Sequence, residues 1–273
     1  MMKFETVHDV TIPKLGFGTW KIGGGSSPDP RLDSVSLAAL KTALETGYTH
    51  FDTAEMYASG HSEELIAQAI RETGTARESL FITSKVLPSH LKYKDVLQAC
   101  ANSLRRLQTD YLDLYLIHWP QAGMNLADTF RALNELVADG KVRHLGVSNF
   151  SLRLFKEAQS HSKTPLLTNQ VPYSLSDRTY ERDGVLKYYQ DHDVLVTAYE
   201  PVDKGRLPMS STLRAIAEAH NATPFQIALA WLIAKPRVIT IPMSLNPEHI
   251  RENFAAVDID LTPEEQQQLD ELA

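Results

Sequence analysis

Two kinds of apolar pattern alternate along the chain. Short runs rich in β-branched and aromatic residues are typical of buried strands, whereas the segments between them carry apolar residues every three or four positions, as amphipathic helices do. The helical period is clearest in residues 34–44 and 94–107. The predicted strands are 15–20, 49–53, 80–85, 113–118, 143–148, 167–171, 194–199 and 238–242.

This alternation predicts a closed barrel. The strands recur at intervals of about 30 residues, the size of one strand–helix unit, and eight such units complete a (β/α)8 barrel. An open doubly wound sheet would usually carry GxGxxG after its first strand, but here Gly16-Phe17-Gly18 is followed by a different sequence. We therefore expect the α/β class, with residues 1–273 forming a single TIM-barrel domain. Residues 3–12 are predicted to form a hairpin at the barrel bottom, and residues 23–30 a mobile loop.

Composition narrows the classes of partner. The formal net charge of −7 argues against nucleic acid, because phosphate binding favours a basic surface. The single cysteine, Cys100, excludes an intrachain disulfide and a cysteine-based zinc site, and we expect it to be buried. The start of the chain lacks a secretory signal, and no apolar stretch is long enough to cross a bilayer. These features predict a cytoplasmic protein without membrane contact, which we expect to be a monomer.

Ionisable side chains occur where three predicted strands end, and those ends meet at one mouth of a barrel. Asp52 and Lys85 end two strands, His118 ends a third, and Tyr57 lies in the loop after Asp52. A lysine inside an apolar run is costly to bury alone, so Asp52 is its expected partner. Beside this pair the pKa of Tyr57 is expected to fall toward neutrality. The phenol would then donate a proton to a developing alkoxide while His118 polarises the carbonyl.

Each of these residues also has a purely structural interpretation. Asp52 and Lys85 can form an ion pair that only stabilises the barrel. Tyr57 can be a surface residue of its loop, and His118 can be a hydrogen-bonded core histidine. Spacing alone leaves these alternatives open.

Several strings of the sequence resemble one enzyme family. "FDTAEMY", "FITSKV" and "LYLIHWP" are similar to the catalytic segments of the aldo-keto reductase family, in the same order and at similar separations. "LGFGTW", "GVSNF", "TNQVPYS", "TAYEP" and the segment 241–253 match as well, so the resemblance covers nearly the whole chain. It implies NAD(P)H-dependent reduction of aldehydes or ketones to alcohols without a metal. It also implies a tetrad in which Tyr57 is the general acid, Lys85 and Asp52 tune it, and His118 orients the substrate.

The resemblance further implies a nicotinamide site. Ser148, Asn149 and Gln170 match residues that hydrogen-bond the carboxamide, whose donors and acceptors both need partners if one ring face is to be presented. Tyr199 matches the ring that stacks under the nicotinamide, although a tyrosine at a strand end is also common in barrel cores. The further implied cofactor contacts are Thr19, Trp20, Asp52, Pro201, Val202 and Ile241.

The segment after the last predicted strand resembles the family's adenosine-phosphate site. Glu252 and Asn253 match its adenine contacts, and Ser244 and Asn246 match contacts near the ribose 2′ position. Ser244 or Asn246 would also suit a helix N-cap before Pro247, and a helix N-terminus can itself bind an anion.

Two positions depart from the pattern of NADPH-dependent relatives. Met243 and His249 stand where many of them carry a lysine and an arginine that bind the 2′-phosphate. Methionine cannot pair with phosphate, and histidine is cationic only part of the time near neutral pH. Arg251 is expected to point elsewhere, roughly 200° round the helix. We therefore expect weakened NADP(H) selectivity, with dual use or an NAD(H) preference. Because the family as a whole favours NADPH, both NADP(H) and NAD(H) stay open.

The substrate pocket is expected to be open. The sequence ends at Ala273 without the long tail that some relatives fold over their substrate. The predicted pocket residues are Trp20, Tyr57, His118, Trp119 and the loop 121–126. This arrangement predicts broad specificity for small-molecule carbonyl substrates, with high Michaelis constants for small aldehydes.

Two other functions are compatible with a barrel of this kind. A hydrolase or isomerase would use Asp52, Lys85 and His118 differently, although no HxH or HExxH metal pattern occurs among the ten histidines. A cofactor-binding regulatory subunit is the other alternative, because some relatives of the family bind ion channels. Such subunits usually carry extra segments for assembly.

Overall fold

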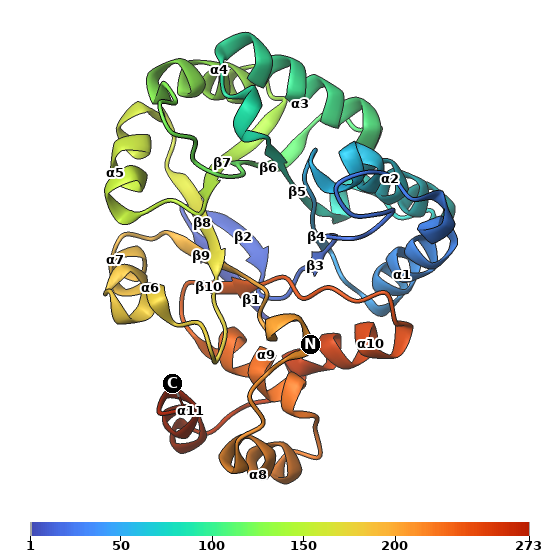
Figure 1. The fold of residues 1–273 in the computed structure, drawn as a ribbon, viewed down its shortest axis with the longest axis vertical. Helices are drawn as coiled ribbons and strands as arrows, with labels where there is room; N and C mark the ends of the chain where they lie inside the picture. Colours follow the sequence, from blue (N-terminus) through green and yellow to red (C-terminus); the bar gives the residue numbers. More distant parts are fainter. Residues whose placement is uncertain (1, 273) are drawn as a thin grey trace.

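The computed structural model describes residues 2–272 and contains the expected ring of strands with helices around it (Figure 1). The sheet has eight strands in the order β10-β9-β8-β7-β6-β5-β4-β3, and each neighbouring pair is parallel. The strands are β3 (Phe17–Gly18), β4 (His50–Asp52), β5 (Phe81–Val86), β6 (Leu112–Ile117), β7 (Val142–Ser148), β8 (Leu166–Pro172), β9 (Leu195–Tyr199) and β10 (Val238–Thr240).

The two edges of this sheet meet and close the barrel. Leu15 pairs with Thr240 in a parallel bridge, and the Gly16 N–H donates to the Thr240 carbonyl at 2.8 Å. Two residues further along each segment, the Gly18 N–H donates to the Pro242 carbonyl at 3.0 Å. The (β/α)8 prediction is therefore confirmed, because closure of the ring distinguishes a barrel from an open sheet.

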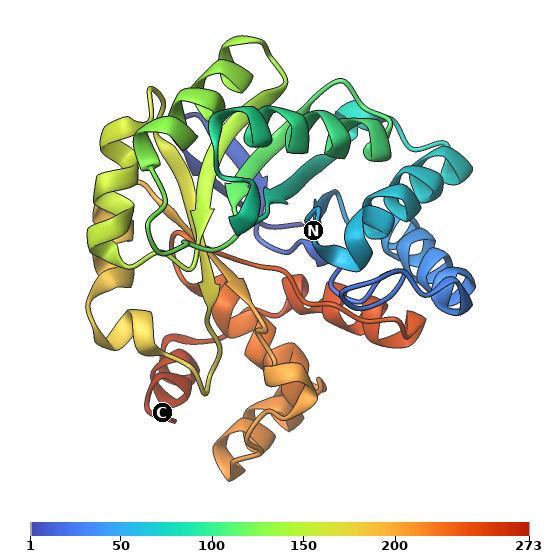
Figure 2. The same cartoon turned by 45° about the horizontal axis from the view of Figure 1, so that its top comes forward.

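Helices cover the outside of the ring (Figures 1 and 2). They bury apolar faces against the strands, and α9 is buried along most of its length, from Ile227 to Ile233. A capping box at Thr223 and Gln226, together with Pro224 at the first helical position, starts α9. The helices are α1 (Asp33–Thr46), α2 (His61–Thr73), α3 (Tyr93–Leu107), α4 (Leu126–Ala138), α5 (Leu152–His161), α6 (Thr179–Arg182), α7 (Val185–Asp191), α8 (Ser211–Ala219), α9 (Pro224–Ala234), α10 (Pro247–Ala255) and α11 (Pro263–Asp270).

Short 3-10 helices occur in the connections between these elements. They are η1 (Pro30–Leu32), η2 (Tyr57–Gly60), η3 (Arg77–Ser79), η4 (Pro88–His90), η5 (Asp203–Gly205) and η6 (Ala256–Asp258). The helix η2 contains Tyr57 and leads into α2, while η1 leads into α1, which packs against α2.

A hairpin fills the bottom of the barrel, as predicted. Strands β1 (Phe4–Val7) and β2 (Val10–Pro13) pair antiparallel. Their side chains Val7 and Ile12 join a small apolar cluster whose other buried members come from the barrel strands: Leu114, Leu116, Leu167, Leu195 and Ile239. This layer seals one end, so polar side chains that point inward are accessible from the other end.

The sequence overestimated the strands that close the barrel. The predicted strand 15–20 is reduced to β3, and the predicted strand 238–242 ends at Thr240. At this junction the two segments pair through one bridge and a few separate hydrogen bonds rather than a continuous ladder. The loop predicted at 23–30 contains a bridge between Gly24 and Pro28.

The sequence also led to expectations about Cys100, membrane-spanning segments and metal sites. Cys100 is fully buried on α3, as expected. Among residues 2–272, no helix combines the length and the apolar character needed to cross a membrane. The same residues hold no group of three or more His, Cys, Asp or Glu side chains arranged to bind a metal ion.

Candidate active site

The structure brings the four predicted catalytic residues together at the open end of the barrel. Asp52 ends β4, Lys85 lies near the end of β5, and His118 directly follows β6. Lys85 Nζ lies 2.5 Å from Asp52 Oδ1 and 3.4 Å from Tyr57 Oη. The Tyr57 and His118 rings meet edge to face, with centroids 5.6 Å apart. Side chains from three strands and one loop thus converge on the tyrosine hydroxyl.

Lys85 is held as a cation although it is inaccessible to solvent. Burial alone would lower the pKa of this amine, but Asp52 and Tyr57 together outweigh burial, and the pKa is raised. A second ammonium proton is donated to the Thr53 carbonyl at 2.8 Å. The third contact of the ammonium group is with the Tyr57 hydroxyl, so a fixed positive charge lies beside the phenol.

The predicted lowering of the Tyr57 pKa is wrong. Burial raises the pKa of the phenol, and Lys85 offsets only part of that effect. The reason is that the hydroxyl is removed from water on nearly every side, which penalises the phenolate more than one ammonium at 3.4 Å stabilises it. Tyr57 is therefore fully protonated at neutral pH.

His118 is a neutral imidazole. Burial, assisted by the charge of Lys85, lowers its pKa to about 3. Its Nδ1 atom is buried and has no hydrogen-bond partner among the described residues. His118 therefore differs from the hydrogen-bonded core histidine that we considered as an alternative.

Three polar residues predicted for the nicotinamide form a continuous group beside the tetrad. The side-chain Nε2 of Gln170 donates to Asp52 Oδ2 at 2.7 Å, and Ser148 Oγ donates to the backbone carbonyl of Gln170 at 2.9 Å. Asn149 Nδ2 donates to Ser148 Oγ at 2.9 Å, and Tyr199 Oη donates to Asn149 Oδ1 at 2.9 Å. Asp52 thus links the group directly to the catalytic lysine.

The chemistry of this group fits a nicotinamide carboxamide. Because the Gln170 amide nitrogen donates to Asp52, the amide oxygen remains as an acceptor for an NH2 group. Asn149 adopts a left-handed backbone conformation, with φ of 63°, directly after β7. The half-buried Tyr199 ends β9 and presents an aromatic ring beside the amides. Donor, acceptor and ring are therefore within reach of one another.

Other predicted cofactor positions differ in how available they are. Thr19 is fully buried, and its hydroxyl donates to the Asp52 carbonyl at 2.9 Å and accepts from Ser62 at 3.1 Å. Its side chain therefore holds β3 against β4. Pro201 is buried and Val202 half-buried in the segment after β9.

The predicted adenosine segment lies on the last connection and on α10. Asn246 is the N-cap of α10, and its side chain accepts from the Glu248 N–H at 2.9 Å, while Ser244 Oγ accepts from the Asn246 N–H at 3.0 Å. Of the two candidate caps, Asn246 is thus the N-cap itself. The other predicted contacts are Ile241 (buried), Met243 and Asn253 (half-buried), and His249 and Glu252 (exposed).

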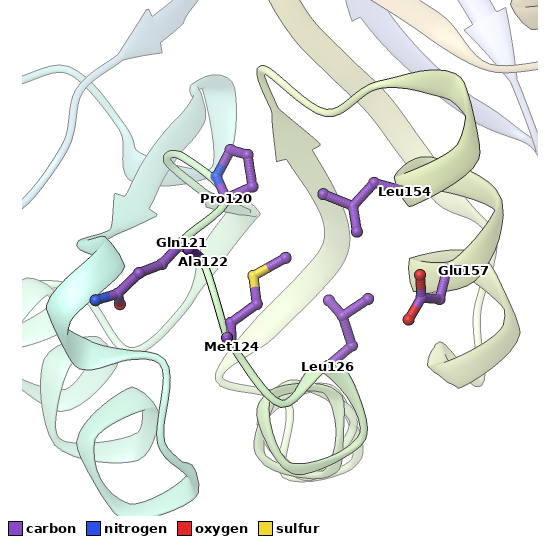
Figure 3. A pocket seen from close by; sticks show the side chains of 8 residues that line it. Pro120, Gln121, Ala122, Met124, Leu126, Leu154 and Glu157 are labelled. Atoms are coloured by element: carbon purple, nitrogen blue, oxygen red, sulfur yellow. The ribbon is translucent and has the colours of Figure 1, made fainter.

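The aromatic walls predicted for the substrate are accessible. Trp20 is 38% exposed, Trp119 is 44% exposed, and the Trp20 ring meets Tyr57 edge to face with centroids 5.1 Å apart. A cavity of about 350 Å³ lies between the loop after β6 and α5. Figure 3 shows its wall of Pro120, Met124, Leu126 and Leu154, with Glu157 at one side. The tetrad does not line this cavity.

Sequence reasoning missed a residue that braces the tyrosine loop. Glu55 is buried, and its carboxylate accepts from the Leu87 N–H at 2.6 Å and contacts His90 Nδ1 at 3.1 Å. It thereby joins the loop after β4 to the loop after β5. Its position between Asp52 and Tyr57 in "FDTAEMY" was the available signal.

Comparison with known proteins identifies the family of this chain. The family model described as "Aldo/keto reductase family" matches residues 14–273. Methylglyoxal reductase YeaE of Escherichia coli is 38% identical over 268 residues, covering 96% of this chain and 91% of that protein. Glyoxal reductase of Bacillus subtilis is 36% identical over 265 residues, covering 97% and 90%.

Solved structures give the same result. A thermostable aldo-keto reductase, Tm1743, in complex with the inhibitor epalrestat superposes with a TM-score of 0.95 at 47% identity, covering 100% of both chains. An aldo-keto reductase from Klebsiella pneumoniae in complex with NADP and acetate superposes with a TM-score of 0.88 at 39% identity, covering 100% of this chain and 95% of that one.

The chain therefore belongs to the aldo/keto reductase family. It is an oxidoreductase that uses a nicotinamide cofactor to reduce carbonyl groups of small molecules. The resemblance seen in the sequence is confirmed over nearly its whole length.

Proposed function

We propose that Tyr57 is the general acid of this reductase and that Lys85, Asp52 and His118 act through it or beside it. The observation that carries the proposal is the position of Lys85 Nζ, 2.5 Å from Asp52 and 3.4 Å from the tyrosine hydroxyl. A cation fixed there stabilises the phenolate that exists only after the proton has left.

The protonation of Lys85 and of Tyr57 explains the role of each in the proton transfer. Asp52 keeps Lys85 protonated in a buried place, and burial keeps Tyr57 protonated until a stronger base approaches. A reduced nicotinamide held by Ser148, Asn149, Gln170 and Tyr199 would supply a hydride to the carbonyl carbon, which would leave an alkoxide on the oxygen. The alkoxide is far more basic than a phenolate, so the Tyr57 proton moves to it and Lys85 faces the new negative charge.

His118 orients the carbonyl in this proposal. As a neutral ring it has one N–H, which we assign to Nε2, because Nδ1 is buried without a partner to accept a hydrogen bond. Nε2–H would donate to the carbonyl oxygen next to Tyr57. Two donors then share one oxygen, which fixes the carbon for hydride attack.

Small aldehydes, including those with a second carbonyl, are the proposed substrates. The relatives named above are methylglyoxal and glyoxal reductases, and we extend that class to this chain. Trp20 and Trp119 offer accessible apolar walls and few polar groups, so a small substrate would be bound mainly through its carbonyl. Broad specificity with high Michaelis constants follows.

The test is Tyr57→Phe, assayed by loss of reduced-nicotinamide absorbance with a panel of small aldehydes. We expect kcat to fall by about 10³-fold, within the range for loss of a general acid, with cofactor affinity unchanged. A variant that keeps more than a tenth of the activity would show that another group donates the proton.

Second, we propose that the enzyme has a weakened selectivity for NADP(H) and uses both cofactors or prefers NAD(H). Met243 and His249 occupy the positions where a lysine and an arginine bind the 2′-phosphate in many relatives, and the loss of two such contacts would remove about 3 kcal/mol of preference. Dissociation constants for both cofactors test this, with Met243→Lys plus His249→Arg expected to restore NADPH selectivity. A wild-type preference for NADPH of about a hundredfold, roughly 2.7 kcal/mol, would contradict it.

We also propose that the protein acts as a monomer in the cytoplasm. All four tetrad residues come from one chain, and a reduced, buried Cys100 suits a reducing compartment. Light scattering of the purified protein and fractionation of cells expressing it would test the two statements.

A further inference from the structure

The turn that carries Tyr57 has an unusual backbone. Ala58, Ser59 and Gly60 follow the tyrosine in η2 and have φ values of 48°, 53° and 93°. Side-chain-bearing residues rarely adopt positive φ, and two in succession persist only when the surroundings enforce them. The geometry of the proposed proton donor therefore depends on what holds this turn.

The turn is held by the loop that precedes α1. The Ala58 N–H donates to the Gly25 carbonyl at 2.8 Å, and Ser59 Oγ donates to the Ser26 carbonyl at 3.0 Å. Both acceptors are backbone atoms of a loop rich in glycine and serine. Such a loop fixes the turn only if the loop is itself fixed.

His61 provides that attachment. It directly follows the turn as the first residue of α2, and its ring bonds Asp33, the first residue of α1, through Nε2 at 2.9 Å. Its Nδ1 bonds Glu64 at 2.8 Å. The ring also packs on Gly23, where an added Cβ would lie 2.8 Å from His61 Cδ2. Both ring nitrogens face carboxylates, which accept but do not donate, so both must carry a proton.

We propose that His61, as an imidazolium, is a positioning residue for Tyr57. By binding Asp33 it fixes the loop 23–32 against the turn, and the turn sets the distance of the tyrosine hydroxyl from Lys85. The inference rests on the proposed role of Tyr57 as proton donor, and it adds a residue outside the tetrad to the machinery that this role requires.

This contact depends on pH. The charged groups facing the ring are Asp33 from α1 and Glu64 from α2. Burial alone would lower the pKa of His61, but the hydrogen bonds to Glu64 and Asp33 outweigh it and raise the pKa above its usual 6.5. The contact is therefore complete below about pH 6.5 and is lost as the pH rises through the raised pKa.

The experiment compares His61→Asn with His220→Asn. His220 also bonds a carboxylate, that of Glu265 at 2.9 Å, but does so between α8 and α11. At pH 6 we expect H61N to lower kcat about fivefold while KM and cofactor affinity change little, because misplacing a reacting group mainly costs the chemical step. The wild type should lose a similar factor as the pH rises above 6.5, and H61N should lack that decline. H220N should behave as the wild type.

Hydrogen exchange at a single pH gives a readout independent of activity. Amides of residues 57–60 should exchange faster in H61N than in the wild type at pH 6, and H220N should leave them unchanged. Asp33→Ala, which keeps the histidine but removes its acceptor on α1, should reproduce the effect and serves if H61N does not fold.

Wild-type kcat and pH profile in both H61N and D33A would overturn the proposal. So would faster exchange in the turn without any loss of kcat, because the turn would then not position the acid. Tyr57→Phe separates the two ideas: if that variant stays active, the assigned acid is wrong whatever the exchange data show.

Discussion

Two buried lysines lie at opposite ends of the barrel, and their surroundings differ in one respect. Lys85 lies at the mouth and pairs with Asp52 at 2.5 Å, whereas Lys14 lies at the bottom and pairs with Glu5 at 3.0 Å. Both side chains are almost inaccessible to solvent. Each would be costly to bury without its carboxylate.

The remaining ammonium protons distinguish them. Lys14 donates to the Ile233 and Lys235 carbonyls at 2.8 and 2.7 Å, so its charge compensates the carboxyl end of α9 and ties it to the hairpin. Among the described residues, Lys85 has one backbone acceptor, the Thr53 carbonyl, and its contact with Tyr57 is 3.4 Å long.

The pKa values of the two amines also shift in opposite directions. Burial lowers the pKa of Lys14 despite Glu5, since Lys3 and Arg237 add repulsion. Burial also lowers the pKa of Lys85, but Asp52 and Tyr57 together outweigh it, so this pKa is raised. A lysine whose donors all end on fixed acceptors fastens the fold. A lysine that contacts a titratable hydroxyl at the open end of the barrel, as Lys85 does, can stabilise the phenolate during the reaction.

Replacing Lys85 by Met gives the sharpest test of this comparison. We expect kcat to fall by about 10³-fold, because the phenolate of Tyr57 loses the cation that lies beside it. Asp52 keeps its hydrogen bond from Gln170, and circular dichroism should confirm that the variant folds. Steady-state kinetics that show less than a tenfold loss would make the mouth pair structural as well.

Replacing Lys14 by Met should produce the opposite pattern. We expect the free energy of unfolding to fall by about 3 kcal/mol, because removing the lysine takes one of two cationic partners from the half-buried Glu5 and leaves it with Arg237. The kcat of the folded enzyme should not change. Urea denaturation and active-site titration measure the two quantities, and a loss of kcat like that of K85M would end the distinction between the two sites.

The smallest expected effect is on the acidic side of the pH profile. With the His118 pKa lowered to about 3, this ring stays neutral, so kcat should change by less than about twofold between pH 6.5 and pH 5. The unfolded chain binds a proton on this histidine below about pH 6.5, so stability decreases as the pH falls from there toward 3. A decline in kcat centred near pH 6 would mean that His118 titrates with its ordinary pKa.

Local patterns were enough to predict the barrel. Apolar periodicity gave the strands and helices, and their spacing gave the (β/α)8 ring, because each repeat must bury one face against its neighbours. The positions of Asp52, Lys85 and His118 at strand ends predicted that they would meet, since parallel strands of a barrel share one mouth.

The electrostatics depended on tertiary structure. Lys14 in "IPKLGFG" and Lys85 in "ITSKVLP" look alike in the sequence, and only folding shows that three acceptors surround one while a phenol faces the other. The Tyr57 pKa was misjudged for the same reason, because desolvation depends on every group packed around a hydroxyl. The contact of His61 with Asp33, 28 residues away, also lay beyond any local pattern. The sequence determined which chemical groups are present and at which end of the barrel they lie, whereas packing decided their protonation and their partners.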